Sequence, residues 1–187
     1  MSLFQQIYTE ETAPEGAGPV LAKVAERLGF VPNIVGKLAE SPAAVKGYAT
    51  LAGILGESSF TPAEQQLLMM TVSRINNCDY CVAAHSTGGL RMGLAEDVVD
   101  AVRAGAPIAD ARLNALRDYC AKVVEKRGWT TEDDQNEFIA AGFSKAQILE
   151  VILAVGVKTL SNYANHVTEP PLDKPFEAAR WSRDKAA

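Results

Sequence analysis

Hydrophobic residues recur at three- and four-residue spacings along most of the chain, and no segment alternates apolar and polar positions as a half-buried strand does. This pattern predicts an all-α protein, a bundle of roughly eight or nine helices. The predicted helices cover residues 18–28, 33–40, 42–56, 62–76, 78–92, 95–104, 110–126, 131–141 and 144–165.

Several helix boundaries follow from capping residues. Ser41-Pro42 and Thr61-Pro62 each place a capping side chain before a proline, whose fixed φ suits the first helical position. Glu64 stands where a capping box with Thr61 would close. Asn76-Asn77 interrupts the pattern, and we expect this pair to end one helix and to cap the next, which begins at or just before Cys78.

The chain reads as a single domain over residues 1–187, because no linker or low-complexity tract divides it. From about residue 167 a tail follows, and three prolines between Thr168 and Pro175 predict that this stretch is extended. Phe176 and Trp181 indicate that the tail docks on the protein's own body or on a neighbouring subunit.

Composition narrows the function classes. The chain is 48% hydrophobic and 22% charged, with a net charge of −5, which disfavours a nucleic-acid partner because phosphate binding needs clustered positive charge. The first 18 residues are polar and acidic, unlike a signal peptide, and the apolar runs fall short of the ~20 residues that a membrane helix requires. We expect a cytoplasmic protein with no membrane partner.

The most informative segment is the C-x-x-C-x-x-x-H motif formed by Cys78, Cys81 and His85. On an ideal helix Cys78 and His85 lie within ~20° of each other, and Cys81 lies ~60° to the side. Cys81 and His85 are also neighbours one turn apart. The spacing therefore predicts one face that carries two sulfurs and an imidazole.

Three effects favour thiol redox chemistry at this face. A cysteine in the first turn of a helix is stabilised as thiolate, which favours Cys78, whereas the adjacent His85 favours Cys81. The residues alone leave open which thiol is the more acidic. The two-residue spacing lets one sulfur resolve an oxidised form of the other as a disulfide.

The cysteines and histidines of the chain also admit structural roles. Structural zinc needs four ligands, and beyond the motif the chain offers only the distant His166 and the lone Cys120, so we expect neither a metal nor a cofactor. The two motif cysteines could also be small core residues. Cys120 shares an apolar face with Leu113, Leu116 and Val123 and is expected in the core. His166 suits a helix C-terminus, the alternative being a group folded back onto the cysteines.

The motif and the helix before it resemble a known family, the alkylhydroperoxidase D-like branch of the carboxymuconolactone decarboxylase superfamily. The resemblance is strong from about Thr61 to Gly93 and weaker from Ser41 to His166. It implies an all-α fold, a homo-oligomer such as a trimer or hexamer, and reduction of small hydroperoxides with electrons from a thiol or lipoyl-type donor. It further implies that Cys81 attacks the peroxide and that Cys78, facing the donor, resolves the product.

Two departures from the family pattern bear on this expectation. The family commonly has a glutamate of a proton relay twelve residues before the first cysteine, where this chain has Gln66. Glu64 is the nearest candidate for that relay, although it lies ~200° around an ideal helix from Gln66. A histidine that the family pattern places between the cysteines is Tyr80 here. Both departures predict a slower peroxidase or a different electrophile.

The leading hypothesis is therefore an antioxidant thiol-dependent hydroperoxide reductase that uses Cys78, Cys81 and His85. One alternative is a carboxymuconolactone decarboxylase-type enzyme, which acts without a cysteine pair. The other is a non-catalytic helical oligomer that senses redox state through its disulfide.

Overall fold

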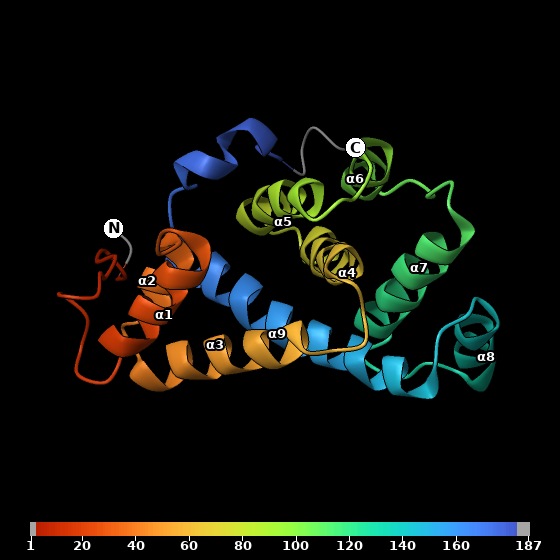
Figure 1. Ribbon diagram of the computed structural model, residues 1–187, viewed down its shortest axis with the longest axis horizontal. Helices are drawn as coiled ribbons and strands as arrows, with labels where there is room; N and C mark the ends of the chain where they lie inside the picture. The colour runs from red at the N-terminus through yellow and green to blue at the C-terminus, as the bar shows by residue number, and fades with distance from the viewer. Residues whose placement is uncertain (1–2, 183–187) are drawn as a thin grey trace.

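The computed structural model describes residues 3–182, and within them the fold is all-α, as predicted (Figure 1). It contains nine α-helices and one 3-10 helix: α1 Gly18–Leu28, α2 Asn33–Leu38, α3 Pro42–Gly56, α4 Pro62–Ile75, α5 Asp79–Arg91, α6 Glu96–Ala104, α7 Ala111–Glu125, α8 Glu132–Ala140, α9 Lys145–Thr168 and η1 Lys174–Ala179.

Helices α4 and α9 form the centre of the molecule. In Figure 1 α9 crosses nearly the whole structure, and α4 packs against it as well as against α5, α6 and α7. Helix α4 can occupy this position because its apolar residues surround it instead of forming one stripe. Leu67, Leu68, Met70 and Val72 are all fully buried.

The capping residues start their helices as predicted. The Ser41 hydroxyl accepts the backbone N–H of Ala44 at the start of α3. At the start of α4, Thr61 and Glu64 form the reciprocal capping box. Each such cap satisfies N–H groups that have no partner within the helix.

The prediction that Asn76-Asn77 caps the next helix is wrong. The N-cap of α5 is Cys78, and Asn77 has a left-handed backbone with φ of 54°. The N–H of Cys78 bonds to the carbonyl of Ser73, and the N–H of Asn77 bonds to that of Arg74. This pattern is a Schellman motif that ends α4, and asparagine tolerates its left-handed position better than most residues.

The tail docks on the protein's own body. Phe176 packs edge-on against Tyr80, with ring centroids 6.1 Å apart. Trp181 is 7% exposed, and its indole N–H donates to the carbonyl of Arg103. The extended stretch is shorter than predicted, because α9 continues to Thr168 and η1 begins at Lys174.

No single helix among residues 3–182 has the length and apolar character to cross a membrane. Helices α8 and α9 satisfy that length and composition criterion only as a pair, with a bend of 109° between them.

Candidate active site

The candidate site lies at the start of α5, where the structure brings Cys78 and Cys81 together as free thiols. Cys78 has an extended backbone, with φ of −95° and ψ of 94°, and therefore precedes the first helical turn in which the sequence placed it. Each cysteine is 2% exposed. Cys81 is surrounded by side chains from α9, which the motif itself does not reveal.

The Cys81 sulfur is held as a thiolate. Its pKa is lowered to about 6, first by the hydrogen bond from the Cys78 thiol, then by the charge and hydrogen bond of Lys158 and by Asn162, against the opposing effect of burial. The side-chain amide of Asn165 also lies within reach, with Nδ2 3.2 Å from Sγ. Hydrogen bonds to the charged form and a nearby cation both favour that form.

The Cys78 thiol has the opposite character. Its pKa is raised above the ordinary value, first by its hydrogen bond to Cys81 and then by burial. Cys78 therefore remains protonated and donates to its neighbour. Because it is the N-cap and not a first-turn residue, the helix-terminus argument for an acidic Cys78 does not apply to this geometry.

His85 lies one turn beyond Cys81, and both ring nitrogens have partners. Nε2 is 2.9 Å from Nζ of Lys158, and Nδ1 is 2.9 Å from Oε1 of Gln66. An ammonium group can only donate, so Nε2 accepts and the ring proton is on Nδ1, which donates to Gln66. Burial, and then the Lys158 charge, hold the His85 pKa well below its usual range. The imidazole is neutral and acts on Cys81 through Lys158.

Lys158 is the central charge of the site. It is 1% exposed, and burial alone would lower its pKa. The negative charge of the Cys81 thiolate is the largest effect that opposes burial, so the pKa of Lys158 is raised and the ammonium persists. A buried cation paired with a buried thiolate satisfies the requirement that interior charges be compensated.

The sequence interpretation missed Lys158, Asn162 and Asn165, although α9 carries a signal for them. Four polar residues, which the structure buries, recur there at spacings of three, four and seven within a largely apolar helix. They are Lys158, Ser161, Asn162 and Asn165. Such a polar stripe on a core helix indicates a functional or buried polar face.

Gln66 reaches His85 because residue 88 has no side chain. A Cβ atom on Gly88 would stand 2.7 Å from Oε1 of Gln66, so any larger residue would displace the amide. Helix α5 continues without interruption through Gly88 and Gly89. These glycines mark a close approach of neighbouring side chains and no weakening of the helix.

The other sequence candidates lie elsewhere. The Glu64 carboxylate is engaged by Thr61 and by the Arg112 guanidinium, so Gln66 and not Glu64 stands beside His85. His166 is exposed in the last turn of α9 and lies next to the Tyr163 ring. Cys120 is fully buried in the core, where burial raises its pKa to about 12.

Tyr80, which stands between the two cysteines, ties α5 to the tail. Its hydroxyl donates to the carboxylate of Asp173, which also accepts the backbone N–H of Asn33. Burial first, and then Asp173, raise the pKa of Tyr80 above its ordinary value. Tyr80 is therefore a protonated anchor.

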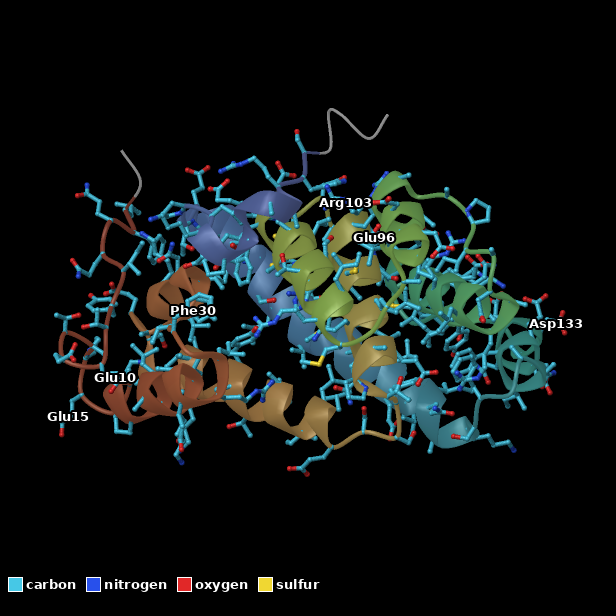
Figure 2. The ribbon with its side chains drawn as sticks, turned by 45° about the horizontal axis from the view of Figure 1, so that its top comes forward. Glu10, Glu15, Phe30, Glu96, Arg103 and Asp133 are labelled. Atoms are coloured by element: carbon cyan, nitrogen blue, oxygen red, sulfur yellow. The ribbon has the colours of Figure 1, made fainter. Side chains whose placement is uncertain are left out.

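A cavity of about 690 Å³ opens onto the site. Its wall includes Cys81, His85 and Lys158. Cys78 is not among the described residues that line it. Figure 2 shows Phe30 on the N-terminal wall, across from α5 and α9. A small oxidant entering this cavity meets Cys81. Among residues 3–182 no group of three His, Cys, Asp or Glu side chains is arranged to hold a metal ion.

Comparisons with known proteins agree on the family and fold. Residues 40–122 match the model of the carboxymuconolactone decarboxylase family, whereas no curated protein matches the chain. The fold is similar to that of an uncharacterized peroxidase-related protein with an alkylhydroperoxidase AhpD core from Ralstonia eutropha JMP134. The TM-score is 0.80 at 24% identity, over 95% of this chain and 96% of that one.

Two further structures share the fold. An uncharacterized peroxidase-related protein from Silicibacter sp. TM1040 gives a TM-score of 0.75 at 22% identity, covering 88% of each chain. The debrominase Bmp8 in complex with 2,3,4-tribromopyrrole gives 0.74 at 13% identity, over 100% of this chain and 98% of that one. The segment that matches the carboxymuconolactone decarboxylase family model includes both motif cysteines, and the fold is that of the alkylhydroperoxidase AhpD core.

Proposed function

We propose that the protein is a thiol-dependent hydroperoxide reductase in which Cys81 is the peroxide-reactive thiol and Cys78 the resolving thiol. One observation carries this proposal. The Cys81 sulfur, with a pKa lowered to about 6, lines the cavity beside the Lys158 ammonium and in hydrogen-bond contact with the Cys78 thiol. A thiolate with a partner thiol and an access route is what peroxide reduction requires.

In the first step the Cys81 thiolate attacks one oxygen of the hydroperoxide. An S–O bond forms, the O–O bond breaks, and the sulfur becomes a sulfenic acid while the peroxide is reduced by two electrons. The leaving alkoxide needs a proton. The Lys158 ammonium, hydrogen-bonded to Cys81, is the cationic donor beside the sulfur and supplies it. Lys158 thus takes the part of the acidic relay residue that Gln66 cannot supply.

In the second step the Cys78 sulfur attacks the sulfenic sulfur of Cys81. A disulfide forms, and the thiol proton leaves with the hydroxyl group as water. A dithiol donor, such as a lipoyl-type group, then returns two electrons and two protons and is itself oxidised to a disulfide. Because each sulfur is 2% exposed, the donor must be small or carried on a slender arm. The homo-oligomeric state implied by the resemblance remains a prediction.

His85 positions the proton donor in this scheme. Its neutral ring accepts from Lys158 and donates to Gln66, which fixes the ammonium next to the sulfur. A protonated imidazole would repel Lys158 and lose that hydrogen bond.

The test is stopped-flow oxidation of the reduced protein by hydrogen peroxide and tert-butyl hydroperoxide, with mass spectrometry of the peptide that contains the motif. The Cys81→Ser protein should not react. The Cys78→Ser protein should react once and yield a sulfenic acid at Cys81 that dimedone traps. Cys120→Ser, in the core away from the site, is the matched control.

Turnover separates a reductase from a redox sensor. With dithiothreitol as donor, a reductase consumes many equivalents of peroxide, whereas a sensor consumes one. Peroxide consumption by Cys81→Ser at the wild-type rate, or oxidation that stops after one equivalent while donor is present, would reject the proposal.

A further inference from the structure

The cavity is much larger than a small peroxide requires. At about 690 Å³ it falls in the range of sites for drug-sized ligands, whereas hydrogen peroxide needs little more than the ~30 Å³ of one water molecule. Most of its exposed wall is apolar, including Val24, Phe30, Ile34 and Met69. The shape and lining fit an organic molecule with an extended apolar part.

Apart from the Cys81 thiolate, every charged side chain among the described residues that line the cavity is cationic. Lys23, Arg27, Lys46, Arg91 and Lys158 line it, and among residues 3–182 no lining residue is acidic. The chain as a whole is acidic, with 23 Asp and Glu against 18 Lys and Arg. A cleft that is lined mainly by charges of one sign and has apolar walls strengthens the local electric field. It therefore concentrates ligands of the opposite charge.

Helix α1 contributes both cationic and apolar side chains to the cavity wall. Five of its six lining residues follow the spacing of a single helix face: Val20, Lys23, Val24, Arg27 and Leu28, with Pro19 as the sixth. This face alternates apolar and cationic positions. Arg27 and Arg91 occupy the last turns of their helices, where a cation also suits the helix dipole. That effect does not account for Lys23, at the middle of α1, or for Lys46, near the start of α3.

The exposed Arg27 and the buried Cys81 thiolate act electrostatically on the same side chain, that of Tyr48. The guanidinium of Arg27 and the ammonium of Lys158 both act on the hydroxyl of Tyr48, and so does the charge of Cys81. Tyr48 lines the same cavity. The exposed Arg27 and the buried Cys81 thus belong to one cavity wall, and both act on Tyr48.

We propose that this cavity binds an amphipathic organic anion, a carboxylic acid with a long apolar chain that bears the hydroperoxide. The carboxylate lies at the rim against Arg27 and Lys23, and the chain runs along the apolar wall so that the peroxide group reaches Cys81. This inference rests on the proposed function for the identity of the reacting group, but the binding of the anion does not depend on it.

Binding is tested on the Cys81→Ser protein by titration calorimetry, with decanoate and the matched neutral probe 1-decanol below their micellar concentrations. Decanoate should bind more tightly than decanol, and its advantage should shrink as salt is raised. Arg27→Gln should weaken decanoate binding by about fivefold, as expected for the loss of one partly exposed ion pair. Lys145→Gln removes a charge outside the cavity and should leave the affinity unchanged. Equal affinity for the two probes would overturn the inference.

Turnover is tested with linoleic acid hydroperoxide and its methyl ester, which differ only in the carboxylate. The wild-type kcat/KM should favour the acid by about tenfold at low salt, and Arg27→Gln should reduce that ratio to about twofold. Equal rates for acid and ester would reject this substrate class while leaving the reductase intact. Tight decanoate binding with no reduction of any hydroperoxide would reject the proposed function and leave the anion site standing.

Discussion

The Lys158 ammonium lies 2.9 Å from Nε2 of His85, from a position 73 residues further along the chain. Burial first, and then the charge of this lysine, lower the His85 pKa and keep the imidazole neutral. The neutral imidazole in turn holds the lysine next to the Cys81 thiolate. The reactive sulfur thus depends on a cation from α9 as much as on its own motif.

Lys158→Met should raise the Cys81 pKa from about 6 towards its ordinary value of 9.0, because the thiolate loses its cation. At pH 7 alkylation of Cys81 by iodoacetamide should slow roughly tenfold, since the thiolate is the nucleophile. Methionine has a similar length, and replacing a buried charge by an apolar group is often tolerated. Lys145→Met is the control, and an unchanged alkylation rate in Lys158→Met would contradict the assignment.

Peroxide reactivity should depend on pH with a single inflection in the neutral range. The Cys81 pKa is lowered to about 6, so the thiolate is lost as pH falls below that value. The second-order rate constant should fall about tenfold for each pH unit below 6 and be flat from pH 7 to 10. The raised pKa of Lys158 keeps the ammonium charged over that plateau. A rate still climbing between pH 8 and 9 would indicate an ordinary thiol.

Gln66→Glu should raise the His85 pKa, because a carboxylate beside Nδ1 favours the protonated ring. Histidine NMR can follow the change, since the chain contains two histidines and the exposed His166 serves as an internal reference. Gln66→Met removes the hydrogen bond without adding charge. If the His85 resonance titrates identically in Gln66→Glu and Gln66→Met, the contact between residues 66 and 85 is absent in solution.

Gly88→Ala should lower peroxide turnover without lowering the stability of the protein. Alanine favours a helix by ~1 kcal/mol over glycine, and the displaced atom is the end of a flexible side chain, so the free energy of unfolding should not fall. The new methyl group pushes the Gln66 amide away from His85, and peroxide turnover should decrease. Gly53→Ala on α3 meets nothing within 4 Å and is the matched control. Unchanged turnover in Gly88→Ala would mean that Gln66 does not orient the ring.

Tyr80→Phe should destabilise the protein by about 1–3 kcal/mol, because the buried Asp173 carboxylate loses the Tyr80 hydroxyl and keeps only the N–H of Asn33 among the donors described above. Urea unfolding measures the change. Limited proteolysis should also detect earlier cleavage in the tail that Asp173 holds. Tyr163→Phe alters an exposed tyrosine on α9 and should have no effect on either measurement. Wild-type stability in Tyr80→Phe would show that this anchor contributes little.

Most of the fold could be predicted because the helix boundaries are local properties. Ser41, Thr61 and Ser144 each begin a helix through a side-chain cap that is readable within four residues. The error at Asn76-Asn77 has the same local origin. Asparagine is suited both to an N-cap and to the left-handed end of a helix, and the hydrogen bonds back to Ser73 and Arg74 select the second role.

The site was only partly predictable because its electrostatics are non-local. The motif spacing places Cys81 and His85 on neighbouring turns, but it does not specify what lies between them. Lys158 reaches both through the packing of α9 across α4 and α5, a tertiary relationship that no short motif encodes. The polar stripe on α9 was the available signal, but its residues are spread along a largely apolar helix.

The position of Lys158 also limits what the match to a family model can say about this site. The matched segment, residues 40–122, contains both sulfurs, the imidazole and Gln66, while Lys158, Asn162 and Asn165 lie beyond its end. Two proteins with the same cysteine motif could therefore differ widely in thiol acidity, because the residues of α9 that set this acidity lie outside the motif. For proteins of this fold, inheriting the nucleophile and inheriting its reactivity are separate events.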